Sequence, residues 1–198
     1  MIKRCEFMNY IDMINDIEDK KCELTEDNYY HAFFYEKDEF VSMINDGIKS
    51  RLLLHKESAG YNGYFYVSLM KEKECKYSIY RKLYHLPMFM IDHRIKAIKT
   101  KNYKTGGNII EMFESTFFPL RGSVYDDEYQ KFLKVSEKDI IGIVYNIYYN
   151  YLNNGDIKND LMVLRSIVEV LKEQESNLLI IDKSSNKFIN KEKVLCYK

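Results

Sequence analysis

The apolar residues of this chain fall mainly into short runs of strand character, and this pattern limits the possible folds most strongly. Aromatic and β-branched residues dominate the runs at 29–35, 64–69 and 140–145, and Met, Phe and Ile make up most of the run at 87–92. Such residues favour pleated, half-buried strands. Residues 159–174 instead repeat their apolar side chains with the period of an amphipathic helix. The sequence therefore predicts an α+β fold with a strand-rich centre.

Shorter elements are expected between these runs. Phe40, Met43 and Ile44 share one face of a predicted helix, with Asp38 as its N-cap and Gly47 as its end. We also expect short strands at 51–54, 95–99, 128–135, 178–181 and 188–189, a turn at 60–63, and helices at 10–17 and 71–83.

The chain has 198 residues, which is enough for one well-buried domain and short for two. Two prolines, eight glycines and no low-complexity linker leave few places for a domain boundary. We therefore expect a single domain over 1–198, with a polar lead-in (1–27), a core (28–146) and a C-terminal helix with closing strands (147–198).

Charge and cysteine usage narrow the class of protein. Thirty basic and thirty acidic side chains cancel, which argues against a protein held on nucleic acid by bulk charge. The four His lack metal-ligand spacing, and the four Cys are scattered, so no disulfide framework or metal site is expected. No signal peptide or membrane span is predicted. These features indicate a reduced, cytoplasmic protein that needs neither a metal nor a membrane.

A set of ordered motifs lies between residues 30 and 145. The segment Gly63-Tyr64-Phe65-Tyr66-Val67-Ser68-Leu69 forms a strand pattern, and Tyr77 follows Tyr66 by eleven residues. Glu128 and Tyr129, with Phe132, then open a late strand. This order resembles the ADP-ribosyltransferase superfamily, in its diphtheria-toxin and poly(ADP-ribose) polymerase branch, whose active sites use a His, a Tyr and a Glu.

The resemblance implies two facing, mostly antiparallel sheets flanked by helices. It also implies an enzyme that breaks the nicotinamide–ribose bond of NAD. The ADP-ribose would pass to a macromolecular acceptor, either protein or nucleic acid, or to water. NAD is then a substrate, with no metal required. A small stand-alone bacterial enzyme of this type resembles toxin, phage-defence or phage-borne modifying enzymes.

Three residues would carry the chemistry if the resemblance holds. Glu128 would stabilise the oxocarbenium-like sugar that forms as the bond breaks. Tyr66 and Tyr77 would sandwich the nicotinamide ring and hold the reacting bond in place. Gly63 would let the backbone approach the ligand closely. The loop 115–127 would face the acceptor, with Arg121 and Tyr125 as its recognition groups.

The first motif of the family contains a His, for which His31 is the candidate. Counting back from Gly47 by the family's spacing reaches Phe33, and His31 lies two residues earlier, on the same side of a strand. Either an insertion of two residues restores the motif, or the chain uses no motif His. His31 would contribute to binding NAD in the first case.

Other interpretations remain open at the level of the sequence. The chain could be an inactive relative that binds NAD or another nucleotide as a sensor or inhibitor, or an interaction module with a Tyr-rich surface. Glu128 could belong to a solvated acidic turn, Tyr66 and Tyr77 to the core, and His31 to the framework of a strand. The lysines at 96, 99, 101 and 104 are typical of a solvated face.

Overall fold

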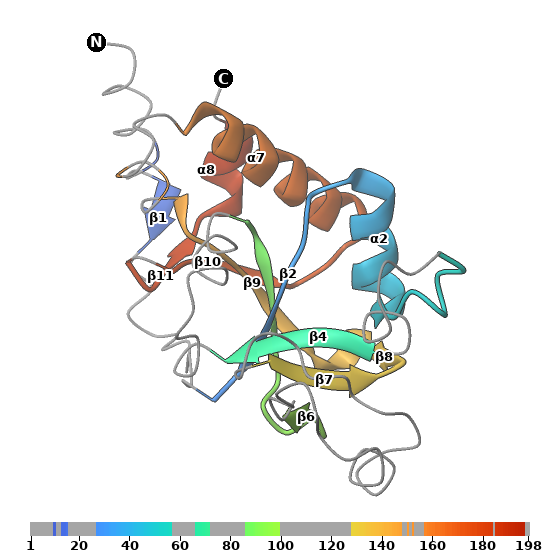
Figure 1. Ribbon diagram of the computed structural model, residues 1–198. Helices are drawn as coiled ribbons and strands as arrows, with labels where there is room; N and C mark the ends of the chain where they lie inside the picture. The colour runs from blue at the N-terminus through green and yellow to red at the C-terminus, as the bar shows by residue number, and fades with distance from the viewer. Residues whose placement is uncertain are drawn as a thin grey trace, which may run out of the picture.

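The computed structural model describes residues 10, 13–15, 27–56, 66–71, 86–99, 128–147, 150, 152, 157–183 and 185–196. These residues form an α+β structure with one large, mostly antiparallel sheet and few helices, which confirms the predicted class (Figure 1). Within the described residues, no helix has the length and apolar character needed to cross a membrane.

Nine described strands form the main sheet, in the order β1-β11-β10-β9-β5-β2-β4-β7-β6. Only β9 and β10 pair in parallel; the other neighbours are antiparallel. The strands are β1 (Ile14–Asn15), β2 (Tyr29–Ala32), β4 (Tyr66–Lys71), β5 (Met88–Ile91), β6 (Ile98–Lys99), β7 (Glu128–Phe132), β9 (Ile140–Tyr145), β10 (Leu179–Asp182) and β11 (Lys187–Ile189).

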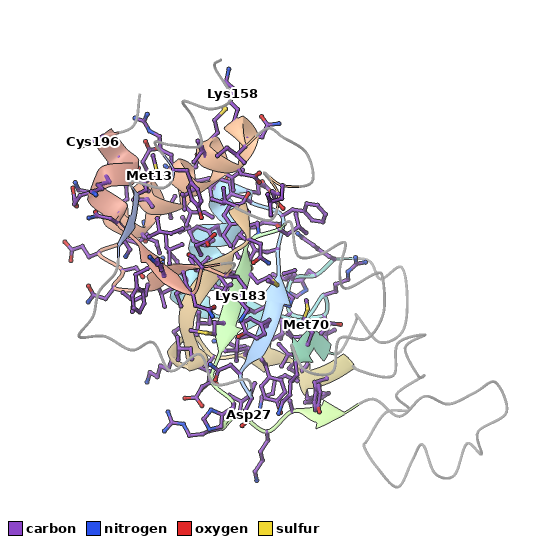
Figure 2. All side chains as sticks on the ribbon, turned by 90° about the vertical axis from the view of Figure 1, so that its left-hand side faces the viewer. Met13, Asp27, Met70, Lys158, Lys183 and Cys196 are labelled. Atoms are coloured by element: carbon purple, nitrogen blue, oxygen red, sulfur yellow. The ribbon has the colours of Figure 1, made fainter. Side chains whose placement is uncertain are left out.

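The parallel pair needs a crossover, which helix α7 (Lys158–Glu173) supplies. The apolar stripe predicted for this helix is buried, and Leu164, Ile167 and Leu171 have no exposed surface. A short helix, α8 (Lys191–Cys196), follows β11 and packs against α7. Helices α2, α7 and α8 lie along one side of the sheet (Figure 1), and side chains fill the layer between (Figure 2).

The sheet changes direction between β2 and β4. These strands share only two residue pairs, Tyr29 with Lys71 and Tyr30 with Met70, whereas β2 shares four with β5. In Figure 1, β4 and β7 consequently run across the direction of β2 and β9. The resemblance implies two facing sheets. Among the described residues, the strands instead form one continuous nine-stranded sheet and a small β3–β8 pair.

Helix α2 (Lys37–Asp46) ends at Gly47, as predicted. Gly47 has φ 81°, a conformation that favours glycine, and a Cβ placed on it would lie 2.2 Å from the Val135 carbonyl oxygen. Both the backbone conformation and the lack of space therefore require glycine here. The chain then enters β3 (Ile48–Lys49), which pairs with β8 (Lys134–Val135). The expected N-cap Asp38 instead lies in the first turn, after Glu36 at the cap position.

The N-terminal lead-in contributes to the described core. Tyr10 and Met13 are buried, and the backbone N–H of Asn190 donates to the Met13 carbonyl. Met13 accordingly lies near the C-terminal helix in Figure 2. The helix predicted over 10–17 is wrong at Ile14–Asn15, which pair as β1 with β11. Pairing with a distant strand overrides the local helical pattern here.

Two predicted strands need correction. Residues 51–55 form a turn, in which the Leu54 N–H donates to the Ser50 carbonyl. Leu53 and Leu54 remain about two-fifths exposed, and no strand in the described part of the chain pairs with them. The strand predicted over 128–135 is broken at Leu133, whose φ of 58° separates β7 from β8. A 3₁₀ turn, η2 (Glu137–Asp139), capped by the Ser136 hydroxyl, leads into β9.

Candidate functional site

A pocket of about 590 Å³ opens beside the end of β2. This volume lies in the range of small-molecule sites. The end of β2, helix α2, β3 and the turn 51–56 form its walls. Its described lining consists of His31, Ala32, Phe33, Phe34, Asp38, Glu39, Ser42, Met43, Gly47, Ile48, Lys49, Arg51, Leu54 and Lys56.

His31 occupies the place where the backbone pairing of β2 and β4 stops. Its ring Nδ1 lies 2.8 Å from the Ser68 carbonyl oxygen on β4 and, since a carbonyl only accepts, must be the donor. Burial of the ring lowers the pKa of His31, and the hydrogen bond to Ser68 opposes this shift. A neutral ring with its proton on Nδ1 leaves Nε2 as a hydrogen-bond acceptor. Among the predicted site residues, His31 is the one that the structure assigns to the pocket wall.

The two alternatives for the first motif can be compared with the positions of His31 and Phe33. Phe33 is 5% exposed and stacks on Phe89, with ring centroids 4.5 Å apart, and on Phe40 at 5.5 Å. Phe33 is therefore a core residue. The backbone leaves β2 after Ala32 and runs through four residues before α2 begins at Lys37. An insertion of two residues relative to the family's spacing would lie in or beside this connection, so both alternatives for the first motif stay predictions.

The pocket combines an apolar floor with charged side chains at its rim. Ile48 is buried, while Phe34 is 78% exposed. Lys56 forms an ion pair with Glu39, and Lys49 pairs with Asp46 at 3.0 Å. Exposed pairs of this kind contribute little, so these lysines can exchange their partners for an anionic ligand at small cost.

The backbone places two further candidates on neighbouring strands. Tyr66 begins β4 and pairs with Phe132, and Glu128 begins β7 and pairs with Met70. Their register positions are thus four residues apart along β4, or roughly 13 Å. The strands that carry His31, Tyr66 and Glu128 are consecutive in the sheet, in the order β2-β4-β7. The side chains of Tyr66 and Glu128 are outside the described part of the structure.

The remaining predicted site residues are Gly63, Tyr77, Arg121 and Tyr125, and all four lie outside the described residues. The loop predicted over 115–127 lies there as well. Their proposed roles therefore remain predictions.

Sequence reasoning did not find the pocket residues after α2. Lys49 and Arg51 follow Gly47 and Ile48, and they reach the pocket because the helix ends against β8. The available signal was the helix-ending glycine followed at short spacing by two cations, Lys49 in β3 and Arg51 in the turn after it. Within the described residues, no group of three or more His, Cys, Asp or Glu side chains could hold a metal ion.

A second polar cluster lies at the carboxyl ends of β9 and β10. The Tyr145 hydroxyl donates to Asp160 Oδ1 at 2.6 Å, and the Tyr10 hydroxyl donates to Asp182. Ser185 donates to the same Asp182 from both its N–H and its hydroxyl, at 2.8 and 2.7 Å. Burial raises the pKa of Tyr10 and of Tyr145, and the neighbouring carboxylates raise it further. These groups bond to one another and stabilise the fold.

Comparison with known proteins adds no relative to this description. No protein-family model matches the chain, and no curated protein matches it significantly.

Proposed function

We propose that this protein is an ADP-ribosyltransferase-like enzyme that cleaves the nicotinamide–ribose bond of NAD and transfers ADP-ribose to a macromolecular acceptor. The observation that carries the proposal is the adjacency of β2, β4 and β7, because these strands bear His31, Tyr66 and Glu128. The motifs are far apart in the sequence, and the strands that bear them are neighbours in the sheet.

The pocket supports the same proposal. A dinucleotide needs a polar acceptor for its ribose hydroxyls, cations for its pyrophosphate and an apolar surface for its bases. His31 Nε2, the cations Lys49 and Arg51, and the exposed ring of Phe34 supply these three kinds of group in one pocket. The fold assigned under this proposal is the ADP-ribosyltransferase type.

The reaction follows from the chemistry of the bond. The bond between ribose C1′ and the pyridinium nitrogen breaks, and neutral nicotinamide leaves with the electron pair. The acceptor nucleophile, or water, then bonds to C1′ and loses a proton. Glu128 would stabilise the positive charge that develops on the ribose, while Tyr66 and Tyr77 would hold the nicotinamide. Arg121 and Tyr125 would contact the acceptor.

The substitution Glu128→Gln tests this assignment. It keeps the size of the side chain and removes its charge, so turnover should fall about 10²–10³-fold, or roughly 3–4 kcal/mol in the barrier. NAD affinity should change little, since the charge acts mainly in the transition state. The measurement is nicotinamide release and transfer of label from NAD that is radiolabelled in its adenylate phosphate.

Glu169→Gln serves as the matched control, because Glu169 is an exposed carboxylate on α7 that pairs with Arg165. It should keep wild-type turnover. Wild-type turnover in Glu128→Gln would remove Glu128 from the mechanism. If the wild type shows no turnover and NAD still raises its melting temperature, the protein is a nucleotide-binding relative. If NAD changes neither turnover nor melting temperature, the proposal fails.

A further inference from the structure

Lys71, the last residue of β4, lies where three strands of the sheet meet. Its ammonium nitrogen is 4.8 Å from the centre of the Tyr29 ring and 5.4 Å from the centre of the Tyr129 ring. The two rings contact each other edge to face, with centroids 5.2 Å apart. Tyr29 belongs to β2 and Tyr129 to β7, so Lys71 links β4 to both of its neighbours.

The surroundings of this cluster strengthen the attraction between the cation and the rings. Tyr29 and Tyr129 are 6% and 9% exposed. An ammonium group over a ring that is shielded from water is attracted more strongly than one over an exposed ring. Removing the charge of Lys71 would therefore loosen the contact between β2 and β7 across the end of β4.

The position of the cluster relates it to the proposed catalytic carboxylate. Tyr129 directly follows Glu128, and Met70, the register partner of Glu128, directly precedes Lys71. The backbone of Glu128 is thus held in two ways: it pairs with Met70 on β4, and the next residue, Tyr129, contacts Lys71 through its ring. A shift of this backbone would move the attached carboxylate, and a misplacement of about 1 Å can lower a rate about 10²-fold.

We propose that Lys71 is a positioning residue for Glu128. Lys71 acts through the rings of Tyr29 and Tyr129 and fixes the start of β7 relative to β2 and β4. This inference rests on the proposed function. Lys71 contacts neither NAD nor the acceptor in this role. It sets the geometry of Glu128 during bond cleavage, so its loss should affect turnover more than NAD binding.

The test compares Lys71→Met, which keeps the length of the side chain and removes its charge, with Lys71→Arg, which keeps the cation. Lys71→Met should lower kcat for nicotinamide release about 10- to 100-fold with KM unchanged, and Lys71→Arg should restore most of kcat. Tyr129→Leu, which removes one ring, should reproduce the loss. The control is Lys131→Met, on β7 opposite Val67, which should keep wild-type kcat.

Several outcomes would overturn the positioning role. If the wild type turns over and Lys71→Met keeps its kcat, this inference fails while the proposed function stands. A rise in KM alone would make Lys71 a substrate contact. A loss of activity that only follows the folded fraction, and that Lys71→Arg does not rescue, would make its role purely structural. A wild type that does not cleave NAD would overturn the proposed function, and this inference with it.

Discussion

Two regions of the molecule differ in where their polar side chains find partners, in the interior or at the surface. The C-terminal unit, residues 140–196, encloses them: Tyr145 bonds to Asp160 and Tyr10 to Asp182 beneath the buried face of α7. The pocket region, residues 31–56, leaves them at the surface, in exposed ion pairs around a cavity. Polar groups that bond to one another in the interior stabilise a fold. Those that pair loosely at a rim remain available to a ligand.

The two regions also differ in how far their strands stay paired. In the C-terminal unit β9 and β10 stay paired over four residue pairs under α7. In the pocket region β2 leaves β4 after two pairs, and the His31 ring replaces the missing backbone contact by bonding to the Ser68 carbonyl. A sheet that opens in this way provides a concave surface and a directed polar side chain at the same point.

The largest effect is expected from Leu164→Ala in the C-terminal unit. Leu164 is fully buried on α7, so the cavity left behind should lower the free energy of unfolding by roughly 2–5 kcal/mol. Folded protein should keep its melting-temperature shift with NAD, since the pocket is elsewhere. Urea unfolding measures the free energy, and thermal unfolding with and without NAD measures the shift in melting temperature. Met162→Ala, 61% exposed on the same helix, is the control and should change stability by less than about 0.5 kcal/mol.

The substitution Gly47→Ala should affect both stability and the pocket. The positive φ and the contact with the Val135 carbonyl oxygen together predict a loss of roughly 2–4 kcal/mol in unfolding free energy. The end of α2 must also move, which displaces Ile48 and Lys49 and weakens NAD binding. Calorimetric titration with NAD would detect this change. Unchanged affinity would mean that the pocket does not hold NAD.

The substitution Tyr10→Phe tests whether the N-terminal segment helps to stabilise the C-terminal unit. It removes one donor from buried Asp182 and should lower the free energy of unfolding by about 1–3 kcal/mol. The raised pKa of Tyr10 has a further consequence. The folded state keeps this proton above pH 10, where an unfolded tyrosine ionises, so this contribution is complete below pH 10 and is lost as pH rises further. Tyr10→Phe should therefore destabilise less at pH 11 than at pH 7. An equal loss at both pH values would contradict this linkage.

The smallest effect is expected at the Asp92–Arg94 pair, after β5. Hydrogen bonds from Arg94 lower the pKa of Asp92 to about 2. The pair contributes stability above the unfolded pKa of about 3.9, and that contribution is lost as pH falls toward 2. Because Arg94 is 80% exposed, Arg94→Ala should lower the free energy of unfolding only slightly at pH 7, and less at pH 2 than at pH 7. Urea unfolding of the wild type and of Arg94→Ala at the two pH values measures whether the stability difference shrinks as the pH falls.

The regular elements followed from local pattern. The strand over 140–145 and the helix predicted over 159–174 appear at nearly the predicted bounds, because their apolar repeats match the strand and helix periods. The short strands were harder to predict. Leu52, Leu53 and Leu54 have strand-like character, yet no strand among the described residues pairs with them, and they form a turn. Local preference decides little when pairing partners come from distant parts of the chain.

The sequence by itself determined the α+β class and the end of α2 at Gly47, because each depends on local composition or spacing. The candidate site residues come from the resemblance and stay predictions. Only the tertiary structure decided that the strands bearing His31, Tyr66 and Glu128 are neighbours, and that Lys71 lies against rings from two other strands. It also decided that Tyr10 is a core residue. These relations join residues tens of positions apart or more, and they are set by the buried surface that the assembled sheet shares with its helices.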